Sequence, residues 1–447
     1  MAYDLILKNG TVVLPWGIAE TDIGVSNGRI TGIGRNLGAA ENILDAANLH
    51  ILPGIIDPHV HFRDGGPHAD GSEGGIPGVE NLASGSRGAI LGGVTTVFDM
   101  PNTDPPGTGA AALNAKRDSI AGRAWCDVGI YAGATKENAG ELAEMEVMEG
   151  VCAIKLFAGS STGNLMVEDD ASIERVMRSG HRRIAFHSED EYRLQARASL
   201  FKCDDPYASH ALWRDVECAF LGTRRILALA RKTNRPAHIL HVSTAEELGY
   251  IGDFRDICSV EVLLNHLVQA APECYERLGG YAVMNPPIRD QRHADAAWAA
   301  VNNGMVDTIA SDHAPHSRAA KEKPWPTCAS GLTGVQTLLP MMLEQLNQQK
   351  LSLPRLADLM SAGPARIYGA RNKGRIAMGY DADFTIVDLK KTRRIENRWI
   401  ASQCGWSPFD NEKVTGWPTA TILRGQIVMR EDEVLGTPSG RHVRFNA

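Results

Sequence analysis

The sequence predicts an α/β protein built on a (β/α)₈ TIM barrel, with a small β-sandwich domain formed from both chain ends. Two observations carry this prediction. In the middle of the chain, short apolar and β-branched runs alternate eight times with helix-like stretches, whereas both ends contain short strand-like runs separated by turns. A length of 447 residues suits one large domain with a smaller one attached.

The two ends are predicted to form the β-sandwich, residues 1–52 as its N-terminal part and 373–447 as its C-terminal part. The first part contains the runs DLILKNGTVVL, DIGVSNGRITGIG and HILPG, in which Asn-Gly pairs at 9–10 and 27–28 are hairpin turn signals. The second part contains DADFTIVDL, TATILRG and QIVMRE. We expect strands from the two ends to pair in one domain.

The middle segment, residues 53–372, is predicted to be the metal-dependent barrel. Its strand-like runs are GIIDPHVH, TTVFDM, CDVGIYAG, AIKLFAG, RIAFHSE, AHILHVS, SVEVLLNHL and DTIASDHAP. Helices are expected between them, for example over 81–92, 140–149, 214–232 and 291–303. In such barrels the chemistry lies at the C-terminal ends of the strands.

Polar residues interrupt several runs at those ends. His59 and His61 are two residues apart, so the period of a strand puts both on one face. The same alternation in the sixth run points His241 into the barrel and makes His238 structural. It also turns two residues of the fifth and eighth runs inward, His187 and Asp312.

Lys155 lies in the middle of the apolar run AIKLF, where an unpaired ammonium would cost several kcal/mol. One resolution is carbamylation by CO₂, which converts the amine into a carboxylate-like group able to bridge two metal ions. The other is an ordinary buried pair between lysine and a carboxylate.

Four histidines, a lysine and an aspartate at strand ends form a ligand set for two divalent ions. Nitrogen and oxygen donors suit zinc, with manganese or cobalt also chemically plausible. Each feature alone is commonly structural, because His-X-His can be incidental and an Asp before His is usually a cap or turn. Their coincidence at the ends of predicted barrel strands favours a metal site.

Composition narrows the classes of partner and compartment. A formal charge of −7 argues against nucleic acid or an anionic membrane as the main partner. The eight cysteines form no CxxC pair, which argues against a thiolate zinc site or a disulfide framework and fits a reducing compartment. No basic-then-apolar leader and no run of roughly 20 apolar residues is present, so a cytoplasmic protein is expected.

Several motifs together resemble those of the dihydroorotases of the amidohydrolase superfamily. They are, in order, GIIDPHVHFRD, FDMPNT, AIKLFAGSSTGN, HSEDE, HILHVSTAEEL, NPPIR, IASDHAPH and SGLTGVQ. The resemblance covers about residues 50 to 390. It ends in GRIAMGYDADFTIVDL, a stretch similar to the usual exit of the superfamily into its small β-domain.

The resemblance implies a binuclear metal centre, most simply of two Zn²⁺ ions. His59, His61 and Asp312 would hold the more buried ion, and His187 and His241 the outer one. Lys155, carboxylated by CO₂, would bridge the two. A hydroxide bridging the metals would be the nucleophile, because bound metals lower the pKa of water. Asp312 would be the catalytic general base and acid.

The resemblance also implies a clamp for a substrate carboxylate. Arg63 follows His61 closely, and a guanidinium binds a carboxylate bidentately. In dihydroorotases the matching Arg, Asn102 of MPNT and His316 of DHAPH bind this carboxylate, and Asn285 of NPPIR would contact the ring. The implied reaction is the reversible hydrolysis of L-dihydroorotate to N-carbamoyl-L-aspartate in pyrimidine biosynthesis.

Three stretches depart from the common pattern and leave the exact substrate open. Asn265 stands where many dihydroorotases have a histidine, residues 65–80 are long and glycine-rich, and NEKVTGW is an unusual late motif. The rival readings are an allantoinase, hydantoinase or dihydropyrimidinase, and an inactive scaffold for a partner such as a carbamoyltransferase. Barrels of this type often form dimers or tetramers, so a homo-oligomer that binds a small molecule is expected.

Overall fold

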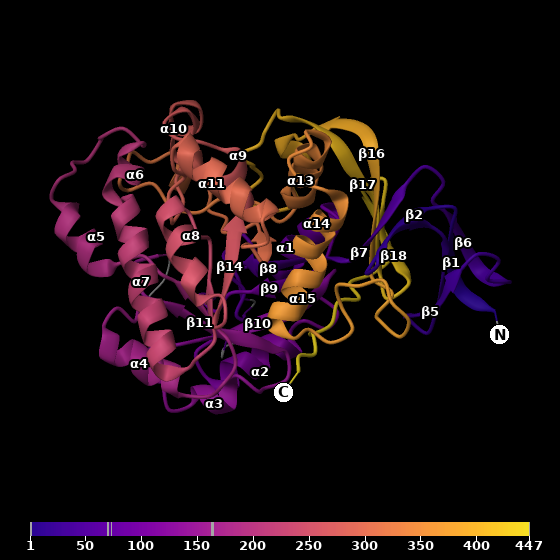
Figure 1. Cartoon of the computed structure of the whole chain (residues 1–447), viewed down its shortest axis with the longest axis horizontal. Coiled ribbons are helices and arrows are strands. Elements are labelled where there is room, and N and C mark those ends of the chain that lie inside the picture. Colours follow the sequence, from indigo (N-terminus) through magenta and orange to yellow (C-terminus); the bar gives the residue numbers. More distant parts are fainter. Residues whose placement is uncertain (1, 69–70, 73, 162–164, 447) are drawn as a thin grey trace.

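A barrel and a two-sheet β-sandwich lie side by side in the computed structural model of the chain (Figure 1), which describes residues 2–68, 71–72, 74–161 and 165–446. The chain ends supply the sandwich and the middle supplies the barrel, as predicted. The residue limits 1–52, 53–372 and 373–447 stay predictions.

The barrel consists of eight parallel strands that follow one another in chain order. The last strand meets the first through a parallel bridge between Val60 and His313, where the His61 N–H donates to the His313 carbonyl oxygen at 2.7 Å. Each of the eight predicted runs overlaps one strand. They are β8 (Ile55–Val60), β9 (Val94–Asp99), β10 (Asp127–Gly133), β11 (Val151–Phe157), β12 (Ile184–His187), β13 (Ala237–Ile239), β14 (Cys258–Leu263) and β15 (Thr308–Ala310).

Helices surround the barrel (Figure 1). The α-helices are α1 (Leu82–Leu91), α2 (Ala110–Asp118), α3 (Leu142–Met145), α4 (Asp170–Arg178), α5 (Glu191–Ala198), α6 (Ser209–Trp213), α7 (Val216–Thr233), α8 (Ala245–Ile251), α9 (Leu264–Val268), α10 (Glu273–Leu278), α11 (Gln291–Asn302), α12 (Arg318–Lys321), α13 (Leu338–Asn347), α14 (Leu353–Ala357) and α15 (Gly363–Tyr368). Shorter helical turns are η1 (Gly252–Phe254), η2 (Gly279–Ala282), η3 (Asp358–Ala362) and η4 (Asn397–Trp399).

Three of the four predicted helices match α1, α7 and α11 closely, whereas the predicted helix 140–149 is reduced to the single turn α3. The chain has to turn back immediately to begin β11. Gly150 adopts a left-handed φ of 85°, and the Val151 N–H donates to the Met148 carbonyl oxygen. A longer helix would leave no residues for this turn.

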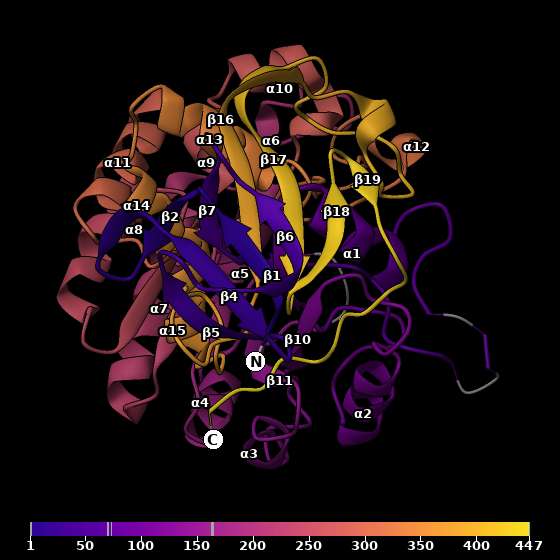
Figure 2. The ribbon, with the colours of Figure 1, turned by 90° about the vertical axis from the view of Figure 1, so that its right-hand side faces the viewer.

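The sandwich combines a sheet shared by both chain ends with a sheet from the N-terminal end alone. The shared sheet has the order β19-β18-β17-β16-β7-β2-β3, and its centre is the antiparallel pair of β16 (Phe384–Arg394) and β7 (His50–Pro53). Its other strands are β2 (Thr11–Leu14), β3 (Gly17–Glu20), β17 (Lys413–Leu423), β18 (Gln426–Arg430) and β19 (Glu433–Val434). The second sheet contains β1 (Tyr3–Lys8), β4 (Asp22–Ser26), β5 (Arg29–Gly34) and β6 (Ala40–Asp45). Figure 2 shows these strands in front of the barrel.

Only one of the two predicted Asn-Gly hairpins forms. Asn27 and Gly28 both have positive φ, 53° and 72°, as a type I′ turn requires, and they join the antiparallel pair of β4 and β5. The prediction at 9–10 is wrong, because β1 and β2 belong to different sheets. Only Asn9 has positive φ there, 61°, so the chain crosses between the sheets instead of folding back.

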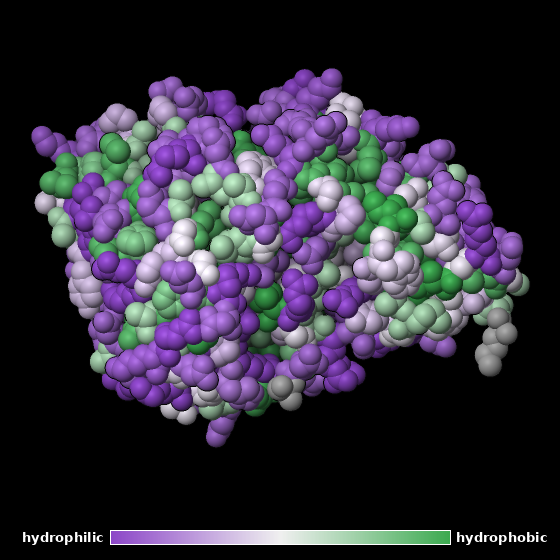
Figure 3. All heavy atoms as spheres, viewed as in Figure 1, coloured by the Kyte–Doolittle hydropathy of each residue, from purple (hydrophilic) through white to green (hydrophobic). Residues whose placement is uncertain are grey.

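Each body has its own apolar core. One buried cluster fills the space between the barrel strands and their helices, and a second fills the sandwich. The face shown in Figure 3 is largely hydrophilic, with apolar residues in separate groups. Among the described residues, none of the helices combines the length and apolar character that a membrane crossing needs.

Candidate active site

The predicted site residues meet in one cavity at the C-terminal ends of the barrel strands. The cavity is narrow, with a volume of about 20 Å³. Nine of the ten predicted site residues line it: His59, His61, Arg63, Asn102, Lys155, His187, His241, Asn285 and Asp312. The tenth, His316, does not line the cavity but donates to the carbonyl oxygen of Ser330, which does.

His59, His61 and Asp312 form the first group of candidate metal ligands. Asp312 Oδ1 lies 3.3 Å from His59 Nε2 and 3.1 Å from His61 Nε2. All three residues are buried, and their ligand atoms lie within 4.8 Å of one another. The two histidines that period 2 placed on one face therefore do face one point.

His187 and His241 form the second group. His187 Nδ1 lies 3.1 Å from His241 Nε2, and both side chains are buried. The rings of His59 and His241 have centroids 5.5 Å apart, so the two groups are neighbours in one cavity. His238 lies outside this cavity, with its Nδ1 2.7 Å from the Ser259 hydroxyl, which agrees with its predicted structural role.

Lys155 lines the same cavity as both groups and has a buried amine. It is 1% exposed, and Nζ has no hydrogen-bond partner among the described residues. Nζ lies 4.5 Å from the centre of the Phe157 ring, a cation–π distance. Burial lowers the pKa of Lys155 to about 7, with Asp312 and Glu261 opposing. The alternative of a direct lysine–carboxylate pair is not seen in the part of the chain described.

Asp312 is held as a carboxylate. Burial alone would raise its pKa, but the His59, His61 and His241 rings lower it well below the usual range. Its backbone has a left-handed φ of 46°, and Arg63 and His241 share this conformation, at 63° and 40°. Such backbone is uncommon for residues other than glycine and concentrates at functional sites. Here it directs side chains that lie beyond the strand ends into the cavity.

Three histidines have hydrogen-bond partners on the nitrogen that faces away from the centre. His59 Nδ1 donates to Glu261 Oε1 at 2.7 Å, and His61 Nδ1 donates to Asn102 Oδ1 at 2.6 Å. These bonds place the proton on Nδ1 and leave the Nε2 lone pairs directed at the centre. Sequence reasoning missed Glu261. The signal was a carboxylate in the apolar run SVEVLL, comparable to Lys155 in AIKLF.

The third partner is Glu189, which sequence reasoning also missed. His187 Nε2 donates to Glu189 Oε2 at 2.9 Å, which leaves Nδ1 free of its proton. Arg214 Nη1 donates to the same oxygen at 2.5 Å. Burial alone would raise the pKa of Glu189, but Arg214 and His187 lower it to about 2. Glu189 is therefore charged and fixes the ring of His187.

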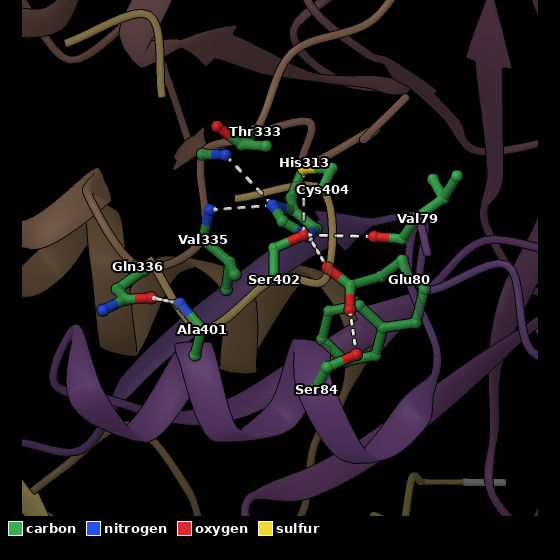
Figure 4. Close-up of polar contacts among 12 residues, drawn as sticks. Val79, Glu80, Ser84, His313, Thr333, Val335, Gln336, Ala401, Ser402 and Cys404 are labelled. Atoms are coloured by element: carbon green, nitrogen blue, oxygen red, sulfur yellow. Dashed lines mark hydrogen bonds and ion pairs between the residues drawn. The ribbon is translucent and has the colours of Figure 1, made fainter. Parts of the chain in front are cut away.

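A buried hydrogen-bond network surrounds His313, the residue that follows Asp312 in the chain (Figure 4). His313 Nε2 donates to Glu80 Oε2 at 2.9 Å, and His313 Nδ1 accepts the Gly334 N–H at 3.0 Å. Because Nδ1 accepts one hydrogen bond and Nε2 donates another, the orientation of the His313 ring, directly after Asp312 in the chain, is fixed.

Arg63 presents an unsatisfied guanidinium to the cavity. The residue is 3% exposed, and its Nε and Nη2 have no hydrogen-bond partner among the described residues. Burial lowers the pKa of Arg63 to about 10, so the group stays charged at neutral pH. Two buried donors without acceptors lower the stability of the folded protein. An anionic ligand that accepts from both of them would remove this cost.

The other predicted substrate contacts lie around Arg63. Asn285 lines the cavity, and its Oδ1 accepts from His210 Nε2 at 3.0 Å. His316 Nε2 donates to the Ser330 carbonyl oxygen at 3.0 Å. Lys321 fixes that loop, because its buried Nζ donates to the carbonyl oxygens of Ala329 and Gly331. Asn102 lines the cavity and also orients His61.

Among the described residues, none of the three departures from the family pattern lines the cavity. Asn265 is buried and its Oδ1 accepts from Gln269 Nε2, and NEKVTGW runs into β17 of the sandwich. Residues 69–70 and 73 of the long glycine-rich segment, and 162–164 of the motif after Lys155, lie outside the described residues.

The donor set fits divalent cations. The partners of His59 and His61 place the ring proton on Nδ1, so the Nε2 atom of each ring is an acceptor. Asp312 Oδ1 is also an acceptor and lies 3.3 Å and 3.1 Å from these two nitrogens, so no hydrogen bond can join the three atoms. The same holds for His187 Nδ1 in the second group. Nitrogen and oxygen acceptors converging in this way are the arrangement that zinc requires.

Comparison with known proteins agrees with this geometry. Residues 50–428 match the model of the amidohydrolase family. The chain belongs to this family. It is 31% identical to a dihydroorotase of Methanosarcina acetivorans, over 97% of this chain and 94% of that protein. It is also 31% identical to an allantoinase of Solibacter usitatus, over 99% of this chain and 97% of that protein.

A solved structure shows the same architecture. The L-hydantoinase (dihydropyrimidinase) of Arthrobacter aurescens matches with a TM-score of 0.91 and 27% identity, covering 99% of this chain and all of that one. The protein is a hydrolase of cyclic amide C–N bonds. The substrate within this class depends on the residues that line the cavity.

Proposed function

We propose that the protein is a dihydroorotase, which hydrolyses L-dihydroorotate reversibly to N-carbamoyl-L-aspartate in pyrimidine biosynthesis. The buried guanidinium of Arg63, with two donors that no described residue satisfies, carries this proposal. Dihydroorotate has a carboxylate to fill this position. The rings of hydantoin, dihydropyrimidines and allantoin have none, so these substrates would leave both donors unpaired.

The proposed metal centre consists of two divalent ions, most simply Zn²⁺. His59, His61 and Asp312 would hold one ion and His187 and His241 the other, because their ligand atoms form two neighbouring groups. Ions bound there would polarise the ring carbonyl and lower the pKa of water.

Lys155 is proposed to bridge the ions as a carbamate. Carbamylation joins the amine nitrogen to the carbon of CO₂ with loss of a proton, so it needs the neutral amine. Burial provides it by lowering the pKa of Lys155 to about 7. A carbamate would also remove the cost of an ammonium without partners beside two cations.

Asp312 is proposed to move the proton. As water adds to the ring carbonyl carbon, Asp312 accepts a proton, and it delivers that proton to the ring nitrogen when the C–N bond breaks. Its place between His59 and His61 keeps it charged and ready to accept. Arg63, Asn102 and His316 are proposed to hold the carboxylate, and Asn285 the ring.

A carboxylate-free cyclic amide is the alternative substrate, and the allantoinase and hydantoinase relatives favour it as the rival. The test is turnover by the zinc-loaded protein, followed by the loss of ultraviolet absorbance of dihydroorotate. We expect turnover that a chelator abolishes and zinc restores. No turnover of dihydroorotate, with turnover of hydantoin or dihydrouracil by the same preparation, would refute the substrate.

We also propose that the enzyme works in the cytoplasm as a homo-oligomer, a dimer or tetramer. The eight free cysteines, seven of them buried, fit a reducing compartment. Sedimentation of the zinc-loaded protein measures the oligomer directly, and a single monomeric species would contradict it.

A further inference from the structure

A second cavity lies at the opposite end of the barrel from the candidate active site. It has a volume of about 610 Å³ and lies where the C-terminal tail passes the start of β10. Figure 2 shows this tail running below the sandwich and close to β10. A strand of seven residues spans roughly 20 Å, so β10 separates this cavity from the catalytic end of the barrel.

The lining of this cavity is strongly basic. It contains seven Lys and Arg residues against four Asp and Glu residues, although the whole chain carries a formal charge of −7. Three of the four acids already have cationic partners within the lining: Asp118 pairs with Arg117 at 2.7 Å, Asp127 with Lys373 at 2.8 Å and Asp381 with Arg29 at 2.5 Å. The fourth, Glu149, pairs with His442 at 2.9 Å.

Three arginine side chains of the lining are left without an acidic partner among the described residues. Arg371, Arg441 and Arg444 line the cavity, and none of them has a carboxylate within 4.0 Å among the described residues. The nearby carboxylates of Asp127, Asp381 and Asp383 are no cation site, because Lys373 Nζ lies 2.5–3.1 Å from all three. The unbalanced charge of the cavity is therefore positive.

The backbone that carries these arginines is fixed on both sides. On one side, Val128 donates to the Arg441 carbonyl oxygen and accepts the Val443 N–H, both at 2.9 Å. On the other side, the Arg371 N–H donates to the Arg444 carbonyl oxygen at 2.8 Å. Between them Val443 is buried, 1% exposed. Arg441 and Arg444 thus start from an ordered tail, and Arg371 starts from the loop after α15 that is hydrogen-bonded to this tail. The three side chains are exposed, but their fixed backbone lowers the entropic cost of gathering them around a ligand.

We propose that this cavity binds an anion carrying at least two phosphate groups, such as pyrophosphate or the phosphate chain of a nucleoside triphosphate. The planar donor fork of arginine binds phosphate oxygens bidentately, and three unpaired forks match a chain of phosphates better than a single small anion. A volume of about 610 Å³ accommodates a ligand of this size. The proposal is independent of the substrate of the barrel.

The test is calorimetric titration of the full-length, zinc-loaded protein with sodium pyrophosphate, ATP, orthophosphate and citrate. The cavity variant is Arg371→Gln, Arg441→Gln and Arg444→Gln combined. The matched control is Arg35→Gln, Arg87→Gln and Arg398→Gln combined, which removes the same charge from three exposed arginines outside the cavity.

We expect pyrophosphate to bind at least about tenfold more tightly than orthophosphate or citrate. The cavity variant should lose about thirtyfold or more in affinity, and the control variant less than about threefold. Equal losses of affinity in both variants would mean that pyrophosphate binds through the general surface charge. Unchanged affinity in the cavity variant would mean that pyrophosphate binds by chelating the bound metal. Either result, no binding by the wild type, or equal binding of citrate would overturn the proposal. ATP measured beside pyrophosphate shows whether the phosphate chain alone is recognised, because a base-specific site would bind ATP more tightly.

Discussion

Replacing Arg63 by methionine should separate carboxylate-bearing substrates from all others. Methionine fills a similar buried volume without a charge. The structure leaves two buried donors of Arg63 without partners, Nε and Nη2. Hydrogen bonds to charged groups contribute about 1.5–3 kcal/mol each, so losing two costs roughly 3–6 kcal/mol of transition-state binding. That corresponds to a fall of roughly 150-fold to 25,000-fold in kcat/KM for dihydroorotate.

The assay compares wild type and Arg63→Met on dihydroorotate and on dihydrouracil, which has the same ring without the carboxylate. We expect kcat/KM for dihydrouracil to change by less than about threefold, because the proposed role of Arg63 is to bind the carboxylate, which dihydrouracil lacks. Zinc content and thermal midpoint serve as folding controls, and Arg63→Lys keeps the charge but loses the fork. A fall of less than tenfold for dihydroorotate, or an equal fall for both substrates, would refute the role of Arg63.

Three further predictions concern the residues around the histidines. Lys155→Ala should lower zinc below two ions per chain and activity at least about 100-fold, with partial rescue by short carboxylic acids; full activity with two ions would exclude a bridge. Glu261→Gln should weaken zinc binding about 10-fold to 100-fold in competition with a chelator, since His59 loses its charged partner, whereas an unchanged affinity would make Glu261 merely structural. The pKa of Glu189 is lowered to about 2, so its stabilising effect is present above about pH 4.5 and is lost as the pH falls towards 2. Glu189→Gln should therefore lower the free energy of unfolding of the metal-free protein at pH 7 by roughly 3 kcal/mol, measured by urea titration. The difference in this free energy between wild type and variant should shrink at pH 3.5. A difference that grows in acid would contradict this assignment.

The barrel and the candidate metal ligands could be predicted because both rest on local patterns. Alternation of apolar runs gave the eight strands, and period 2 gave the common face of His59 and His61. The parity argument also separated His241 from His238. It selected His241, which lines the cavity, but the strand period it relied on does not extend that far. His241 and Asp312 lie beyond the ends of β13 and β15, and left-handed backbone directs their side chains.

What could not be predicted depends on contacts between distant segments. In the sequence, Glu261 is a single charge in an apolar run and Glu189 is one of several acids in a polar run. Only the closed barrel brings Glu261 on β14 against His59 on β8. The turn at Asn9 failed for a similar reason. Its dipeptide is a hairpin signal, but β1 and β2 find their partners in two different sheets, and this tertiary pairing outweighs the local preference.

The measurement that tests the central claim most directly is the ratio of specificity constants of the zinc-loaded enzyme for dihydroorotate and for three carboxylate-free rings, hydantoin, dihydrouracil and allantoin. The orphaned donors of Arg63 predict a preference for dihydroorotate of at least about 100-fold over each of them. An equal or higher kcat/KM for any of the three would contradict the assignment of the carboxylate clamp and of the substrate with it.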